Sequence, residues 1–505
     1  MPDSKSEVLM QRLVLFFFAV VAALGVWARE EERDTISVSA ELRQTLSSGS
    51  HTPFWLVANR QGLSSIDKGE GCFDIGAVKK MDHDRRFSWG AGVELAVPWN
   101  FTSDFVIQQL YGEIRYRSLS LMVGSHNLEP DLVDQELSCG ELLFSGNARP
   151  IPQIRAGIMQ FEPLRFTNNW LSIKGHLAYG KFTDSSWQQH WAAPMSRYNK
   201  GVLMCDRGVW LKAGNEKKFP LTFSIGIEMA TQFEGTIYNY ERNGVYRDIK
   251  TPSGFSAWMK AFIPLPGGSD NLESERTNVE GNTVGAYDFN LGWTSDAGWK
   301  VNAFWQHMFE DHSMIWIQFP WLDGLWGLNV SLPKNPVISG LTYELMCSKY
   351  QSGPVYNDSS PEVPEQVSGI DNYYNNELYT GWMHWGMAIG NPFFVSPIYN
   401  SDHVLEFYAN RNISHHVGIK GDPMEGLHWR LLLSNTRSWG NYFKPFPEVR
   451  DMWNFLAEVK WRPEKLKQLE CQLSVAFDRG DLVGNNFGVL LGVKYDLPVK
   501  IKKMM

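Results

Sequence analysis

The sequence predicts an all-β protein, a transmembrane antiparallel β-barrel of about 18 strands (16–20), with short periplasmic turns and long extracellular loops. Three observations lead to this prediction. The N-terminus has the features of an export signal and no membrane helix follows it, apolar and polar residues alternate along the rest of the chain, and short turns alternate with long loops.

The composition excludes several other classes of protein. The 505 residues carry 47 Lys and Arg against 55 Asp and Glu, a formal net charge of −8. With 43% apolar residues the chain is neither disordered nor collagen-like. A net-acidic chain is a poor match for nucleic-acid phosphates. The five cysteines form no CxxC pair, so neither a disulfide framework nor a zinc cluster is expected.

The first 28 residues are expected to be a secretory signal peptide. Arg12 precedes the apolar run 13–27, and Val26-Trp27-Ala28 offers a cleavage site. Met10 is an alternative start, and an N-terminal anchor helix is the alternative interpretation, although the run is short for a membrane span. We therefore expect a signal peptide over 1–28 and a single barrel domain over 29–505.

Alternation with a period of two residues indicates membrane-spanning strands. In Leu221–Met229 every odd position is apolar, while the even positions are small or polar. The segments 469–478 and 487–495 show the same pattern. Nine to eleven residues with one apolar and one polar face suit a strand between lipid and a lumen, whereas strands of soluble sandwiches are usually shorter.

Turns and loops support the barrel. Tyr287–Trp293 and Trp299–Trp305 flank a tight turn, Val209–Ala213 and Leu221–Met229 flank another, and Val417–Ile419 and Leu427–Leu433 flank a third. Long Gly-rich and aromatic stretches, 230–283 and 350–400, lie between such hairpins. Trp293, Trp299 and Trp461 stand beside turns, where an aromatic girdle would meet the membrane interface.

The strand number follows from the length of the mature chain, 505 − 28 = 477 residues. A hairpin with its turn and loop takes roughly 50 residues, which gives nine or ten hairpins and about 18 strands. The alternating segment 487–495, which ends at Tyr495, is expected to be the closing strand, and 496–505 are expected to form a tail.

The motifs that resemble catalytic or cofactor-binding sites each lack a required feature. Gly175–Lys181 has phosphate-loop spacing, but Phe182 stands where Ser or Thr is needed and the segment alternates like a strand. His307, Glu310, Asp311 and His312 could offer ligands to an ion, but the simpler interpretation is that they form the polar base of a loop. No GxSxG elbow occurs. We therefore expect no catalytic residues, no metal and no cofactor.

Two aromatic clusters are candidates for carbohydrate binding, because tryptophan rings can stack on sugar faces while neighbouring polar groups hydrogen-bond hydroxyls. Pro320 and Gly324 are expected to keep the first cluster from being regular strand. The alternative is that these rings form membrane girdles or pack loops inside the barrel. The candidate residues are Trp316, Trp321, Asp323, Trp326, Trp382, His384, Trp385 and Asn391.

Several stretches, taken in order, resemble the capsule assembly Wzi family in its Bacteroidetes-type form. They are Thr52–Asn59, Gly146–Pro152, Gln306–Asp311, Trp321–Leu328, Gln351–Pro354 and Ile389–Ile398. The resemblance implies an outer-membrane barrel of about 18 strands whose loops occlude the lumen. It also implies a lectin-like role in holding capsular polysaccharide at the cell surface. Near Gly386 the resemblance implies a basic residue, and Met387 departs from it.

The leading interpretation is a non-enzymatic protein of the cell outer membrane that binds exported capsular or other surface polysaccharide. Its expected partners are this glycan, outer-membrane lipid and the barrel-insertion machinery, and no nucleic acid. A porin-like channel and an outer-membrane enzyme acting on lipid or glycan remain the alternatives. The inward positions Leu490, Ala476 and Phe304 are small or apolar, which favours a plugged barrel over an open pore.

Overall fold

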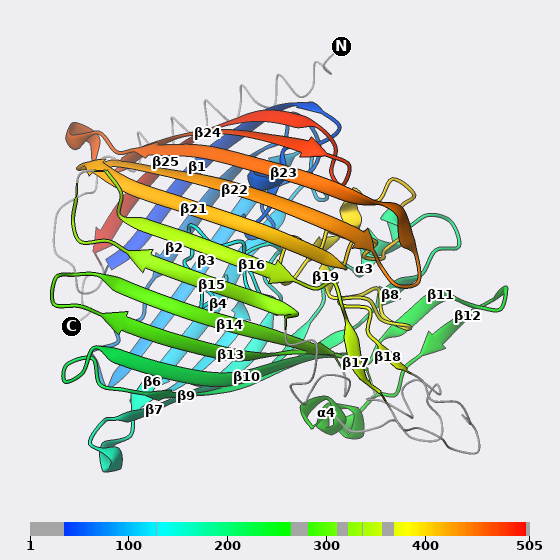
Figure 1. The fold of residues 1–505 in the computed structure, drawn as a ribbon, viewed down its shortest axis with the longest axis horizontal. Coiled ribbons are helices and arrows are strands. Elements are labelled where there is room, and N and C mark those ends of the chain that lie inside the picture. Colours follow the sequence, from blue (N-terminus) through cyan, green and yellow to red (C-terminus); the bar gives the residue numbers. More distant parts are fainter. Residues whose placement is uncertain are drawn as a thin grey trace.

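The computed structural model describes residues 35–127, 129–263, 281–310, 322–335, 337–355 and 368–500, and within them 18 antiparallel strands form one closed barrel (Figure 1). The expected signal peptide lies outside these residues. The barrel strands are β1 (Thr35–Gly49), β2 (Gly71–Lys79), β3 (Phe87–Trp99), β4 (Val106–Tyr116), β5 (Leu119–Ser125), β6 (Gln153–Pro163), β7 (Leu171–Lys181), β9 (Leu203–Ala213), β10 (Leu221–Phe233), β13 (Asn282–Thr294), β14 (Lys300–Glu310), β15 (Gly324–Ser331), β16 (Gly340–Cys347), β21 (Asn412–Met424), β22 (Leu427–Gly440), β23 (Pro445–Trp461), β24 (Leu469–Gly480) and β25 (Asn486–Lys500).

The barrel closes where its first and last strands meet. β1 pairs with β25 in an unbroken register from Thr35 opposite Lys500 to Gly49 opposite Asn486. The predicted all-β fold and the strand number are confirmed. The expected tail after Tyr495 is corrected, because 496–500 continue β25 and supply the pairing that β1 needs at its start.

Every connection at one end of the barrel is short, and all the long loops lie at the other end, together with the short connections 100–105, 441–444 and 481–485 (Figure 1). The turn-end connections include 117–118, 214–220 and 295–299, and the predicted hairpins around 214–218 and 294–298 are confirmed. The third hairpin is tighter than expected, since β21 runs to Met424 and leaves only 425–426 before β22.

The two faces of the wall follow the predicted alternation. Leu473 on β24 is 47% exposed on the outer surface, while Gln472 points inward and donates a hydrogen bond to Glu458 Oε2 at 2.7 Å. Trp293, Trp299 and Trp461, which stand beside turns, are 39%, 40% and 50% exposed, as a girdle at the turn end requires. Leu490, Ala476 and Phe304 are buried on the inner face.

The remaining elements belong to the loop end, apart from η1 and η3 at the turns. They are α2 (Phe54–Val57), α3 (Ser185–Trp191), β8 (Tyr198–Lys200), β11 (Thr236–Arg242), β12 (Val245–Lys250), α4 (Phe255–Phe262), β17 (Ser352–Val355), β18 (Ser368–Ile370), β19 (Met383–His384), β20 (Met387–Ala388) and the 3₁₀ turns η1 (Arg165–Thr167), η2 (Pro397–Tyr399) and η3 (Glu464–Leu466). Among the described residues, no helix is long and apolar enough to cross a bilayer. All five cysteines are free thiols.

The alternation gives a direct test of which face of β24 meets lipid. Leu473→Arg should lower the unfolding free energy in lipid vesicles by about 2–4 kcal/mol, because it places a charge in hydrocarbon. Gln472→Arg is the matched control, since it places the same charge in the polar lumen rather than in hydrocarbon. Urea unfolding measures both, and equal losses would contradict the assigned faces.

Candidate functional site

Long loops turn back into the barrel and fill its loop half with a single hydrophobic core, here called the plug. Its segments are 52–65, 126–127, 129–152, 182–202 and 371–411, and they pack on inward residues of the wall. Tyr373, Tyr374, Trp382, Phe393 and Phe407 of the last segment are at most 1% exposed. The core therefore has the packing of a protein interior, which leaves little room for solute.

Inward polar side chains of the wall hold the plug by forming hydrogen bonds with its backbone. These hydrogen bonds join Cys139 N to Glu344 Oε2 (2.7 Å), Leu142 N to Gln306 Oε1 (2.5 Å), His416 Nε2 to Leu137 O (2.6 Å), Phe54 N to Asp478 Oδ2 (2.9 Å) and Tyr374 N to Glu310 Oε1 (2.6 Å). Because irregular backbone must find partners when it is buried, these contacts explain why polar residues face the lumen at these positions.

The second predicted aromatic cluster lies inside the plug. Trp382 is fully buried and donates from Nε1 to Leu143 O at 2.7 Å, and Asn391 is fully buried and donates to Gly140 O. His384 is 1% exposed, its Nδ1 lies 2.9 Å from Arg149 O, and burial lowers its pKa, so it is neutral. Half-buried Trp385 has the Arg149 guanidinium 4.4 Å from its ring centre. Sugar contact by these four residues stays a prediction.

The first predicted cluster is divided by the structure. Trp316 and Trp321 lie outside the described residues, as do Asp311 and His312. Trp326 belongs to β15, which corrects the expected irregular segment. A side chain at Gly324 would come within 2.4 Å of Gln306 O, so this glycine permits close strand approach rather than breaking the strand. Trp326 faces outward and stacks on Trp305 with ring centres 4.8 Å apart.

Asp323 directly precedes β15 and is fully buried against the plug. Its Oδ2 accepts hydrogen bonds from Gln351 N (2.7 Å) and Tyr373 Oη (3.4 Å), and its Oδ1 accepts one from Tyr350 N (3.3 Å). Burial raises the pKa of this carboxyl to about 6. In this arrangement Asp323 joins the segment after β16 to the plug.

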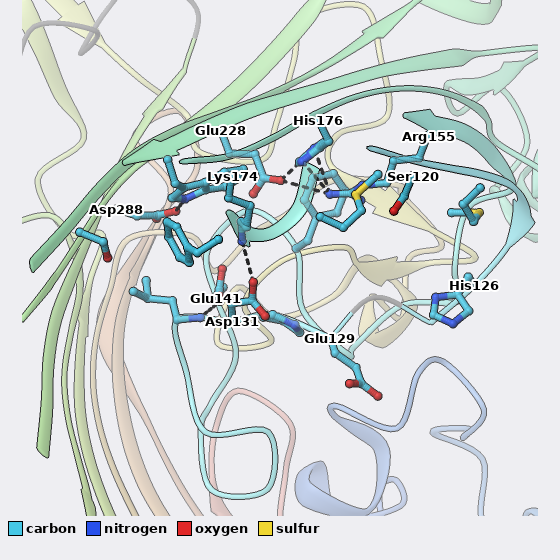
Figure 2. Close-up of a pocket in the computed structure, with 18 of the residues that line it drawn as sticks. Ser120, His126, Glu129, Asp131, Glu141, Arg155, Lys174, His176, Glu228 and Asp288 are labelled. Carbon is cyan, nitrogen blue, oxygen red and sulfur yellow. Dashed lines mark hydrogen bonds and ion pairs between the residues drawn. The ribbon is translucent and has the colours of Figure 1, made fainter. Parts of the chain in front are cut away.

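Below the plug, towards the turn end, the lumen holds a polar chamber of about 290 Å³ (Figure 2). Its lining includes six carboxyl groups, from Glu113, Glu129, Asp131, Glu141, Glu228 and Asp288, against the cations Arg155 and Lys174. Lys174 Nζ lies 2.6 Å from Asp131 Oδ2 across the chamber. Burial and the neighbouring Asp288 raise the pKa of Glu141, which belongs to the plug, to about 8.

One wall of the chamber carries a compact charged cluster. His176 Nε2 lies 2.9 Å from Asp206 Oδ2 and 3.5 Å from Glu228 Oε1, a donor set that could hold a metal ion. However, Arg155 Nη2 lies 3.0 Å from the same ring nitrogen and 4.0 Å from Glu228 Oε1. The guanidinium thus supplies the positive charge that balances these carboxyl groups.

A second group of side chains, here called the rim cluster, lies at the loop end of β22. Lys349 Nζ is 4.1 Å from the Trp439 ring centre, and the Arg411 guanidinium is 3.7 Å from the Tyr442 ring centre. Tyr442 Oη donates to Tyr350 O at 2.6 Å, which ties the group together. Exposed or half-exposed cations and rings side by side can bind a ligand with apolar faces and negative charge.

Neither the chamber nor the rim cluster is predicted from the sequence, although a signal is present in both cases. Arg155, His176, Asp206 and Glu228 occupy inward positions of four neighbouring strands, where the alternation alone places charges in the lumen. The rim cluster draws on the run Arg437–Lys444, which interleaves basic and aromatic residues, but its contact with Lys349 requires the fold.

No protein-family model and no curated protein matches the sequence. Solved structures do match. Wzi of Escherichia coli, described as a carbohydrate-binding β-barrel of the outer membrane involved in group 1 capsule assembly, has a TM-score of 0.55 at 11% identity, over 92% of this chain and 85% of that chain. OpdQ of Pseudomonas aeruginosa gives 0.46 at 10% identity, over 93% and 100%. OccAB4 of Acinetobacter baumannii gives 0.45 at 10%, over 92% and 99%.

This protein is an outer-membrane β-barrel. The closed sheet of 18 strands leaves no edge unpaired, and its outer face exposes the apolar side chains that lipid requires. The likeness to Wzi concerns the fold, and it agrees with a barrel in the outer membrane.

The buried position of Asp323 predicts a pH-dependent contribution to stability. Its folded-state pKa of about 6 lies above the usual 3.8, so the fold favours the protonated form, and this contribution is full below pH 3.8 and lost as the pH rises through 6. Asp323→Asn does not titrate. The stability advantage of the wild type over this variant should therefore be larger at pH 4 than at pH 7.5.

Urea unfolding of both proteins at the two pH values measures this difference. Asp402→Asn, at an exposed carboxylate of the same loop region, is the matched control for loss of charge. If the difference in unfolding free energy between the wild type and Asp323→Asn were the same at both pH values, the raised pKa of this buried carboxyl would be contradicted.

Proposed function

We propose that this protein is a plugged outer-membrane barrel that binds an exported surface polysaccharide and does not catalyse a reaction. The observation that carries the proposal is the plug itself, because the loops fill the loop half of the lumen with buried aromatic side chains. A barrel blocked in this way keeps its outer loops for binding rather than for transport. The fold it shares with a carbohydrate-binding barrel supports the same proposal.

The rim cluster supports an acidic polysaccharide as the ligand. Trp439 and Tyr442 offer ring edges and partly exposed faces to sugar C–H groups, while Lys349 and Arg411 offer donors to carboxylates. This group lies at the loop end of the barrel, where an exported glycan would arrive. A role in attaching or assembling a capsule, and kinship with the Bacteroidetes-type Wzi family, are part of this proposal.

The rim cluster can be tested by binding measurements with polysaccharide extracted from the surface of the producing cells. Trp439→Ala should weaken binding by roughly ten- to hundredfold, by analogy with the ~1–3 kcal/mol of other aromatic stacking contacts. The melting temperature should stay unchanged, because the ring is not in the core. Carboxyl-reduced polysaccharide should bind the wild type more weakly than the native polymer.

Trp326→Ala is the matched control, since it removes a tryptophan from the outer face of β15 within the lipid belt. Undiminished binding by folded Trp439→Ala would contradict the rim cluster. Loss of binding by Trp326→Ala instead would favour the aromatic cluster predicted from the sequence.

A channel is the second candidate, and the polar chamber in the lumen below the plug is the observation that favours it. The plug predicts that the purified protein gives no steady conductance in planar bilayers. Steady ion conductance through the wild-type protein would favour a channel over a binding barrel.

A further inference from the structure

Helix α4 lies outside the barrel wall rather than over its mouth. It packs against the outer face of β9 and β10, close to their loop ends (Figure 1). Its small residues Ala257 and Ala261 are buried there against outward-facing Cys205 and Phe233. Because these two alanines are four residues apart, they form one face of the helix.

The rotation of α4 about its axis is fixed by Trp258. The indole ring stacks on Tyr179 of β7 with ring centres 4.6 Å apart and meets Phe233 edge-on at 5.7 Å. Its Nε1 donates to Glu234 Oε1 at 3.1 Å, and the same oxygen accepts from Gly254 N at 3.0 Å. Tyr179 Oη donates to Trp258 O at 3.1 Å. The helix is therefore held in one orientation.

This orientation turns the large apolar residues of α4 away from the protein. Phe255 is 82% exposed, and Met259 and Phe262, four and seven residues further on, are 43% and 38% exposed. Such spacing forms a continuous apolar stripe along one side of a helix. A helix that buries alanines and exposes phenylalanines is not adapted to water.

The stripe continues the lipid-facing belt of the wall. Val209 and Leu211 on β9 are 47% and 49% exposed on the outer face, and Cys205 beneath α4 lies two outward positions beyond Val209 towards the loop end. The outward position between them is Arg207, whose Nη1 donates to Thr231 Oγ1 at 2.8 Å. A charge on the outer face costs least near the membrane interface, so Arg207 places the loop ends of β9 and β10, and α4 with them, at that interface.

We propose that α4 is an interfacial helix embedded in the outer leaflet, with Phe255, Met259 and Phe262 inserted among the lipid chains. The occupant of the stripe is therefore lipid, because the stripe adjoins a surface that lipid already covers. This surface is distinct from the rim cluster, and the proposal does not depend on the glycan. An amphipathic helix of this kind lies in the plane of the interface with its apolar side in the acyl boundary.

The test uses the full protein in vesicles, with single cysteines labelled by an environment-sensitive fluorophore at Phe255→Cys, Met259→Cys and Phe262→Cys. Ser256→Cys, exposed on another side of α4, is the matched control. Leu473→Cys serves as the lipid reference and Phe443→Cys, in a loop-end turn, as the aqueous reference. Folded protein without a new cysteine, treated in the same way, corrects for the native thiols.

Spin-labelled lipids should quench the fluorescence at the three stripe positions severalfold more than at Ser256→Cys and nearly as much as at Leu473→Cys. Iodide should quench the fluorescence at the stripe positions severalfold less than at Phe443→Cys. Strong quenching by iodide would overturn the proposal, because the helix would then lie in water. Protection from both quenchers would also overturn it, in favour of a protein partner or a second copy of the chain.

Discussion

The pairing of β1 with β25 is the constraint on which the rest of the structure depends. In lipid, each backbone N–H and C=O must find its partner inside the protein, and only a closed sheet provides this for strands. The register from Thr35–Lys500 to Gly49–Asn486 removes both edges. Once the sheet is closed, the two-residue period of each strand divides the side chains between lipid and lumen. The apolar belt and the polar lumen are consequences of that closure.

A closed barrel of this size encloses more space than its own side chains can fill. The loops occupy that space, and they bring irregular backbone whose polar groups need partners. Glu344, Gln306 and Asp478 of the wall provide these partners for Cys139, Leu142 and Phe54. The wall therefore specifies the plug through side chains rather than through further strand pairing. This explains why polar inward residues concentrate where a segment of the plug lies against them.

The sequence predicts what depends on neighbours along the chain. The alternation in Leu469–Gly480 is enough to assign both faces of β24, and the turn after β13 is visible as a run of small polar residues. Prediction fails where a residue's role depends on distant partners. Asp323 meets Tyr350, Gln351 and Tyr373, which are 27 to 50 residues away, and no local pattern marks it as buried. The role of Gly324 is missed for the same reason, since its close neighbour is Gln306 on another strand.

Tryptophan shows why composition alone cannot locate a binding site in such a barrel. Trp382 is buried in the plug, whereas Trp326 and Trp439 both face outward from their strands. Height along the wall separates the last two. Trp326 stands beside Leu328 in the lipid belt, while Trp439 stands between Lys349 and Arg437, at 4.1 and 5.8 Å from its ring centre. Two cations of this kind cannot remain solvated in hydrocarbon. The charge of its neighbours, rather than the ring itself, therefore places Trp439 in water, where a glycan can reach it.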